Sequence, residues 1–135
     1  MSENPDIADY PFQVSENVRF SETDQMGHVN NTVFGVYFEI GRSTYLSENG
    51  FYGQDQVGFV IVKTEITFRG MILWPGRVTI GTRVGRVGTS SFDMEQLLMQ
   101  DDRIVGSAMS TMVVIDLETN SATPIPDAIR AVLNA

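Results

Sequence analysis

Residues 31–49 read NTVFGVYFEIGRSTYLSEN, and this stretch decides the fold of the chain. Its aromatic side chains recur at steps of three and four residues, at Phe34, Tyr37, Phe38 and Tyr45. That period is typical of an α-helix with much of its circumference buried. Asn30 suits the N-cap, because its side chain can accept from the free N–H groups of the first turn, and Gly50 suits the C-terminal end. The pattern predicts a long, buried helix.

The residues outside this helix alternate with the period of two that is typical of half-buried strands. One strand is expected before the helix, at residues 14–20, and four after it, at residues 60–69, 78–84, 92–100 and 105–117. A short helix is expected at residues 127–133, and Val60, Val62 and Ile66 are expected on one face of their strand. One helix cannot cover both faces of five strands, so we predict an antiparallel sheet curled around it, an α+β fold.

The chain divides into a short arm and one domain. Residues 1–12 are polar and acidic with two prolines, and we expect a flexible N-terminal arm there. Residues 13–135 suit a single domain of ordinary size. The first ten residues hold three acidic and no basic side chains, unlike a secretory signal peptide. No apolar run reaches the roughly 18 residues of a membrane-spanning helix. We therefore expect a cytoplasmic protein with no membrane span.

The composition excludes several kinds of chemistry. The chain has no cysteine and one histidine, His28, so disulfides, thiolate nucleophiles and multi-histidine zinc sites are excluded. We expect no metal and no cofactor. The formal net charge of −8, with nine basic residues, disfavours nucleic acid as a partner, because binding to its backbone requires a basic face.

The segment before the helix, SETDQMGHVNN at residues 21–31, has an unusual density of polar side chains. A helix N-terminus offers unpaired N–H groups and a partial positive charge. Asp24 lies seven residues before Asn31 and can fold back over that terminus, and Gly27 permits the tight turn that this requires. The segment therefore brings a carboxylate and backbone N–H donors to one place.

This combination suits acyl transfer. The N–H of Asn31 could stabilise the oxyanion that forms from a thioester carbonyl. Asp24 could act as general base on water, or attack directly and form an anhydride. The competing interpretation is a loop that only caps the helix. His28 could be a structural hydrogen-bonding residue, or it could contact substrate or orient Asp24.

The string RFSETDQMGHVNN at residues 19–31, followed by Phe34, Tyr37-Phe38-Glu39 and Arg42, resembles a known family. It is similar to the hotdog-fold thioesterases of the 4-hydroxybenzoyl-CoA thioesterase type, and weaker similarity extends over residues 13–134. The resemblance implies the hotdog fold, a long central helix wrapped by a five-stranded antiparallel sheet. It also implies a homodimer, often paired into a homotetramer, with substrate at the subunit interface.

The resemblance also implies roles for particular residues. Asp24 matches the catalytic carboxylate, and the backbone N–H of Asn31 matches the oxyanion donor. His28 matches a position whose role varies in the family. Phe34 stands where a tyrosine is usual, so no phenol is expected there. Coenzyme A enters only as part of an acyl-CoA substrate.

Substrate binding is expected to involve Gly27 of the motif and Arg69. A local basic patch would have to oppose the negative net charge if the substrate carries coenzyme A. Four arginines that are close in sequence are candidates: Arg69, Arg77, Arg83 and Arg86. The alternative is that they are solvated side chains of strands.

Hydrolysis of an acyl-CoA to free acid and coenzyme A is the leading hypothesis. The alternative is a hotdog module that binds an acyl ligand without hydrolysing it. A dehydratase or hydratase on the same fold fits less well, because His28 precedes the helix. The acyl group, and the choice between coenzyme A and acyl carrier protein, are left open, although an acidic surface would repel an acidic carrier protein.

Overall fold

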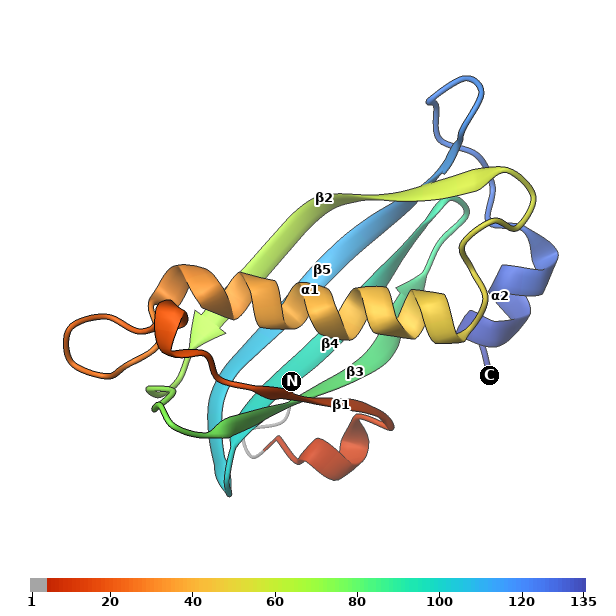
Figure 1. Cartoon of the computed structure of the whole chain (residues 1–135). Coiled ribbons are helices and arrows are strands. Elements are labelled where there is room, and N and C mark those ends of the chain that lie inside the picture. Colours follow the sequence, from red (N-terminus) through yellow and green to blue (C-terminus); the bar gives the residue numbers. More distant parts are fainter. Residues whose placement is uncertain (1–4) are drawn as a thin grey trace.

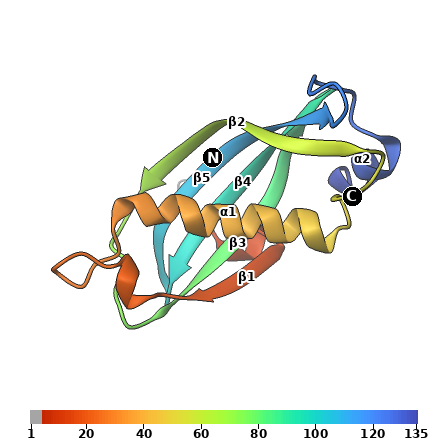
Figure 2. The same ribbon diagram turned by 45° about the horizontal axis from the view of Figure 1, so that its top comes forward.

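A computed structural model describes residues 5–135 of the chain. The strands are β1 (Phe12–Asn17), β2 (Val57–Phe68), β3 (Arg77–Val87), β4 (Ser91–Gln100) and β5 (Arg103–Asp116). The helices are α1 (Asn31–Glu48) and α2 (Asp127–Leu133). All strand pairs are antiparallel, in the order β1-β3-β4-β5-β2, and the curved sheet wraps around α1 (Figures 1 and 2). The predicted fold class is confirmed.

Helix α1 begins and ends where its sequence predicts. The Asn30 side chain accepts from the N–H of Thr32 at 3.0 Å. At the other end Gly50 has a φ of +70°, and the N–H of Phe51 donates to the carbonyl of Leu46 at 2.9 Å. This is the glycine-terminated cap in which a left-handed residue lets the chain turn back on the last helical carbonyls.

The sheet encloses α1 through two apolar clusters. One surrounds Phe34, Tyr37 and Phe38 in the first half of the helix. The other surrounds Tyr45 and Leu46 in the second half and includes the buried side chains of α2. The first half of α1 is therefore fixed to the sheet by large side chains, and this anchors the N-terminal end of the helix in space.

Strand β2 differs from its predicted alternation. Its pairing with β5 shifts register between Ile61 and Lys63, which marks a β-bulge at Val62. An extra residue in a strand moves every following side chain to the other face. Val60 and Val62 are therefore not on the same face as Ile66, whose side chain approaches Gly35 of the helix. Val60 and Val62 are exposed instead.

The segment before α1 also differs from prediction. The expected strand at 14–20 is β1 at Phe12–Asn17, and Phe20 begins a 3₁₀ turn, η2 (Phe20–Glu22). The turn forms because the Glu22 carboxylate accepts the N–H of Arg19 at 2.9 Å, while the carbonyl of Phe20 accepts the N–H of Thr23 at 3.0 Å.

Residues 1–4 of the expected N-terminal arm lie outside the described residues. In the remainder, Ile7–Asp9 form a 3₁₀ turn, η1, and Tyr10 is only 3% exposed. A Cβ atom on Gly81 of β3 would lie 2.6 Å from the Ile7 side chain and 2.7 Å from that of Tyr10. The described part of the arm is therefore packed on the outer face of the sheet.

Gly41 is the point of closest approach between α1 and the sheet. A Cβ atom there would lie 2.6 Å from the Ile80 side chain and 2.7 Å from that of Gln96. We expect Gly41→Ala to lower the free energy of unfolding by about 1–3 kcal/mol, because overpacking outweighs the helix propensity gained. Urea denaturation at a fixed protein concentration measures this.

Gly35 provides the matched control for that substitution. A Cβ atom there would meet only Ile66, at an ordinary contact distance of 3.8 Å. Gly35→Ala should therefore stabilise the protein by up to about 1 kcal/mol. A gain in stability at both positions would show that close approach at Gly41 does not limit the packing of the helix.

Candidate active site

The loop between η2 and α1 is a short, closed turn held by backbone hydrogen bonds. The N–H of Asp24 donates to the carbonyl of His28 at 2.8 Å, and the N–H of Asn30 donates to the carbonyl of Glu22 at 2.9 Å. Gly27 has a φ of +79°, the left-handed conformation that glycine adopts without strain. The loop projects beyond the N-terminal end of α1 (Figure 1). It folds back on itself as the sequence predicts.

Asp24 carries an oriented carboxylate. Its Oδ1 atom accepts from the N–H of Met26 at 2.8 Å and from the N–H of His28 at 3.2 Å. Among the hydrogen bonds of residues 5–135, none uses Oδ2 of this side chain. The loop therefore holds one oxygen of Asp24 by two backbone donors and leaves the other available.

The N-terminus of α1 presents one free backbone donor. The N–H groups of Thr32 and Val33 both donate to Asn30, to its side chain at 3.0 Å and to its carbonyl at 2.9 Å. Within the part of the chain that the structure describes, no oxygen accepts from the N–H of Asn31. The cap thus satisfies the neighbouring donors and leaves the one at Asn31 for a ligand.

Asp24 and Asn31 line the same cavity, whose volume is about 330 Å³. Its remaining walls come from the loop, from α1 and from the segment after β2, through His28, Val29, Asn30, Phe34, Gly70 and Met71. Phe34 is 1% exposed and packs edge-on against Phe68, with ring centroids 5.0 Å apart. Where the resembling family usually has a tyrosine, this cavity has an apolar ring.

His28 contributes to this arrangement mainly through its backbone. Its N–H binds Asp24 Oδ1 and its carbonyl binds the Asp24 N–H. His28 is among the residues that line the cavity, and in residues 5–135 its imidazole makes no hydrogen bond to the Asp24 carboxylate. The main chain of His28 therefore orients Asp24.

The other two sequence candidates lie beside the cavity rather than in it. Gly27 shapes the turn, and its carbonyl accepts the N–H of Trp74 at 3.3 Å. Arg69 immediately precedes Gly70, which lines the cavity, and its Nε donates to the hydroxyl of Ser107 at 3.0 Å. Among the described residues Arg69 forms no ion pair.

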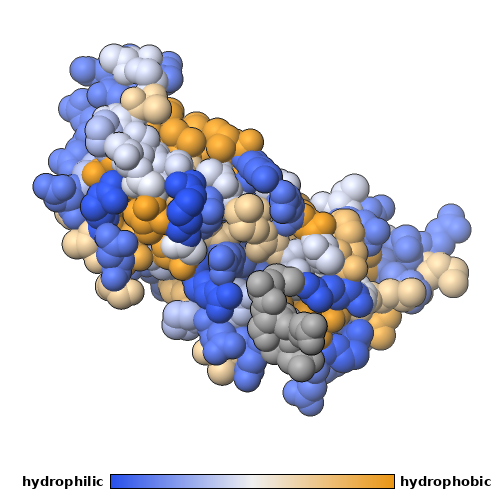
Figure 3. All heavy atoms as spheres, turned by 180° about the vertical axis from the view of Figure 1, so that it is seen from behind, coloured by the Kyte–Doolittle hydropathy of each residue, from blue (hydrophilic) through white to orange (hydrophobic). Residues whose placement is uncertain are grey.

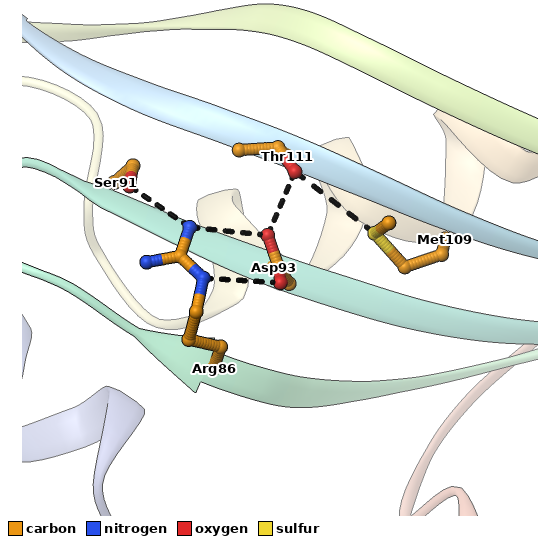
Figure 4. A network of polar contacts seen from close by, with 5 residues as sticks. All are labelled: Arg86, Ser91, Asp93, Met109 and Thr111. Atoms are coloured by element: carbon orange, nitrogen blue, oxygen red, sulfur yellow. Dashed lines mark hydrogen bonds and ion pairs between the residues drawn. The ribbon is translucent and has the colours of Figure 1, made fainter. Parts of the chain in front are cut away.

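The other arginines do not join Arg69 in a basic patch. Arg83 pairs with Glu95 at 2.8 Å, and Arg77 donates to the side chain of Asn17 at 2.7 Å. Arg86 pairs with Asp93, which also accepts from the Thr111 hydroxyl at 2.7 Å (Figure 4). Neighbouring acids therefore compensate two of the four candidate charges, those of Arg83 and Arg86.

The outer face of the sheet carries these paired charges. Figure 3 looks at the molecule from behind the sheet, where hydrophilic and apolar residues are interspersed. A hollow of about 380 Å³ there includes Tyr10, Arg83 and Glu95. The Arg83 guanidinium lies 4.3 Å from the centroid of the Tyr10 ring as well as pairing with Glu95. Tyr10, Arg83 and Glu95 of this hollow thus interact with one another, whereas the cavity at the helix terminus has unpaired donor and acceptor atoms among the described residues.

Two motif residues, Tyr37 and Arg42, are buried within the fold. Tyr37 is 1% exposed, and its hydroxyl donates to Glu22 Oε1 at 2.6 Å. Burial, and then the Glu22 carboxylate, raise the pKa of Tyr37. Arg42 donates to Gln96 and Ser110 in the core, and burial lowers its pKa while Glu39 opposes that change. The sequence pattern suggested only that Tyr37 was a core aromatic and did not predict its contact with the loop.

Among residues 5–135, no three His, Asp or Glu side chains gather closely enough to hold a metal ion. None of the described helices is both long and apolar enough to cross a membrane.

The chain is similar in sequence and structure to several known proteins. A thioesterase from Thermus thermophilus, solved with coenzyme A and zinc, is 31% identical; the match covers 93% of this chain and 99% of that one, with a TM-score of 0.81. A predicted thioesterase from Bacillus stearothermophilus is 29% identical, covering 91% and 93% of the two chains, with a TM-score of 0.83. The uncharacterized protein YsmA of Bacillus subtilis (strain 168) is 28% identical over 103 residues, 69% of this chain and 70% of that protein.

The architecture of these structures confirms the hotdog fold, in which an antiparallel sheet wraps one long helix. The family model of the thioesterase-like superfamily matches residues 18–133, which include the loop, α1 and every strand of the sheet except β1. This chain therefore belongs to the thioesterase-like superfamily.

Proposed function

We propose that this protein hydrolyses an acyl-CoA thioester in the cytoplasm, giving the free acid and coenzyme A. The observation that carries the proposal is one cavity lined both by Asp24, whose carboxylate the loop orients, and by Asn31, whose N–H has no acceptor among the described residues. A thioester hydrolase needs a group that activates or replaces the attacking water and a donor for the oxyanion. We propose that Asp24 meets the first need and the N–H of Asn31 the second.

The proposed reaction proceeds by one of two routes. In the first, Asp24 Oδ2 takes a proton from water while the water oxygen bonds to the thioester carbon. In the second, Oδ2 itself bonds to that carbon, and water later hydrolyses the anhydride. In both, the carbonyl oxygen becomes an oxyanion facing the Asn31 N–H, and its collapse breaks the C–S bond. The departing thiolate is then protonated to the thiol.

Coenzyme A is the favoured carrier on electrostatic grounds. The Thermus thermophilus relative was solved with coenzyme A. The net charge of −8 would repel an acidic carrier protein. Arg69 makes no ion pair in the described part of the chain and adjoins Gly70 of the cavity in sequence, and it is proposed as a binding residue for the coenzyme A phosphates. Gly27 is proposed to serve substrate binding through the shape it gives the loop.

Within the superfamily, the protein is proposed to be a thioesterase of the 4-hydroxybenzoyl-CoA thioesterase type, on the strength of the motif at residues 19–31, and its acyl group is left open. Phe34 supplies an aromatic, hydroxyl-free wall. His28 is proposed to contact the substrate through its imidazole, because the residue lines the cavity and that ring does not bind Asp24 in the described residues. Such a wall accommodates either a fatty or an aromatic acyl group.

Association into a homodimer or homotetramer is proposed on the basis of β2. This strand is an edge of the sheet, and its apolar side chains Val60, Ile61, Val62 and Phe68 are 39–60% exposed. A long apolar edge strand favours pairing with another chain, and a second copy joined there by a two-fold axis would close the edge.

We expect Asp24→Asn to lower kcat by about 10²–10⁴-fold on the best substrate of a panel of fatty and aromatic acyl-CoA species. The asparagine oxygen still accepts from Met26 and His28, so the variant removes the charge and leaves the loop intact. Thiol release, followed with a chromogenic thiol reagent, measures the rate. Asp102→Asn, in the exposed turn between β4 and β5, is the carboxylate control.

Two results would contradict the proposed function. One is full activity of Asp24→Asn. The other is tight binding of acyl-CoA by the wild type with no turnover of any chain length, which would instead indicate a binding module. If turnover is found, a single turnover in water enriched in oxygen-18 distinguishes the routes, because only the anhydride route places the label in Asp24.

For the oligomer, we expect Val62→Asp to shift the protein to monomers in analytical ultracentrifugation, because the new charge opposes pairing along β2. Ala131→Asp, on the exposed side of α2, should leave the oligomer unchanged. An unchanged sedimentation coefficient in the Val62 variant would remove β2 as the interface.

A further inference from the structure

The Glu22 side chain connects the loop to the body of α1. Its Oε1 atom accepts from the Tyr37 hydroxyl at 2.6 Å and from the N–H of Arg19 at 2.9 Å. Tyr37 lies six residues into the helix and is 1% exposed, so its ring is fixed by the core and not by the loop. This short hydrogen bond therefore attaches the loop to the buried side of α1.

The backbone of Glu22 makes a second hydrogen bond, to the residue at the C-terminal end of the loop. Its carbonyl accepts the N–H of Asn30, the N-cap residue, at 2.9 Å. Asp24 follows Glu22 by two residues, and Asn31 follows Asn30 directly. Glu22 therefore links the residues beside Asp24 to the residue before Asn31, and this link sets the separation between the Asp24 carboxylate and the Asn31 N–H.

We propose that Tyr37 and Glu22 are positioning residues for thioester hydrolysis, because their hydrogen bond fixes the Asp24 carboxylate relative to the Asn31 N–H. The inference rests on the proposed function of the site. Neither side chain lines the cavity, so each acts through Asp24. A misplacement of about 1 Å in such an arrangement can cost on the order of 10²-fold in rate.

The phenol is suited to this role. Burial and the nearby carboxylate raise the pKa of Tyr37 above its ordinary value of 10.0, so the hydroxyl keeps its proton and remains a donor at every pH at which a thioesterase is assayed. A bond from a neutral hydroxyl to a carboxylate is one of the stronger kinds of hydrogen bond in proteins.

The test compares Tyr37→Phe with Tyr45→Phe. Tyr45 is the other buried tyrosine of α1, and within residues 5–135 its hydroxyl makes no hydrogen bond, so its variant removes the same atom without touching the loop. We expect Tyr37→Phe to lower kcat by about 10- to 100-fold with KM changed by less than about twofold. Tyr45→Phe should match the wild type.

Two variants at Glu22 separate positioning from general stability. Glu22→Gln keeps an oxygen that can accept from Tyr37, and it should retain activity within about threefold of the wild type. Glu22→Ala removes the acceptor and should reproduce the loss seen in Tyr37→Phe, which keeps the proposal testable if the tyrosine variant folds poorly.

A further test measures the effect of Tyr37→Phe in protein that already carries Asp24→Asn and compares it with the effect of Tyr37→Phe in the wild type. If Tyr37 acts through Asp24, Tyr37→Phe should lower the residual rate of that variant by less than about twofold. The same large factor in both backgrounds would assign the loss to a general structural effect and overturn the proposal.

Hydrogen exchange of the loop amides tests the same contact without using activity. The N–H groups of Met26 and His28 are held by Asp24, and that of Asn30 by Glu22. We expect them to exchange at least about tenfold faster in Tyr37→Phe and at the wild-type rate in Tyr45→Phe. Unchanged exchange would overturn the proposal even if acyl-CoA turnover is found. Faster exchange in a protein that hydrolyses no acyl-CoA would support the contact and refute the proposed function alone.

Discussion

The enclosure of α1 by a single curved sheet is the constraint on which the rest of the molecule depends. A sheet can approach a helix this closely only where the helix lacks side chains, and Gly41 provides that place. Around it, large aromatic rings fill the space on the same helical face. Once the helix is held along its length, its first turn is fixed as well. The direction of its free N–H groups is then a property of the whole core and does not depend on the loop.

The loop before α1 supplies the remaining parts of the candidate site. Asn30 occupies the donors of Thr32 and Val33, and in the described residues that leaves the N–H of Asn31 without an acceptor. The interpretation of this segment as a capping loop and its interpretation as a catalytic loop are therefore compatible. The capping by Asn30 determines which N–H group remains free. The turn that contains Asp24 supplies a carboxylate to the same cavity.

Much of the fold could be predicted from the sequence because its elements follow regular periods. The helix, its caps and the order of the strands come from the period of 3.6, the period of two and the turn residues. The bulge at Val62 could not be predicted, since Val60, Val62 and Ile66 alternate correctly and only the pairing with β5 shows the extra residue. The packing of Tyr10 and Ile7 against Gly81 likewise depends on contacts between distant parts of the chain.

The candidate site was predictable to the extent that its parts are neighbours in the chain. Asp24, His28 and Asn31 lie within one segment, so a local pattern brings them together. The environment of the arginines could not be predicted in this way, because it depends on partners on another strand. Arg83 of β3 pairs with Glu95 of β4, and Arg86 of β3 pairs with Asp93 of β4. A negative protein that binds an anionic ligand must concentrate positive potential near its site. In this structure the N-terminus of α1 lines the cavity and is a source of positive potential there. Arg69 is not among the residues that line the cavity, so in the proposed mechanism the helix terminus binds the reacting carbonyl and a separate group binds the distant phosphates.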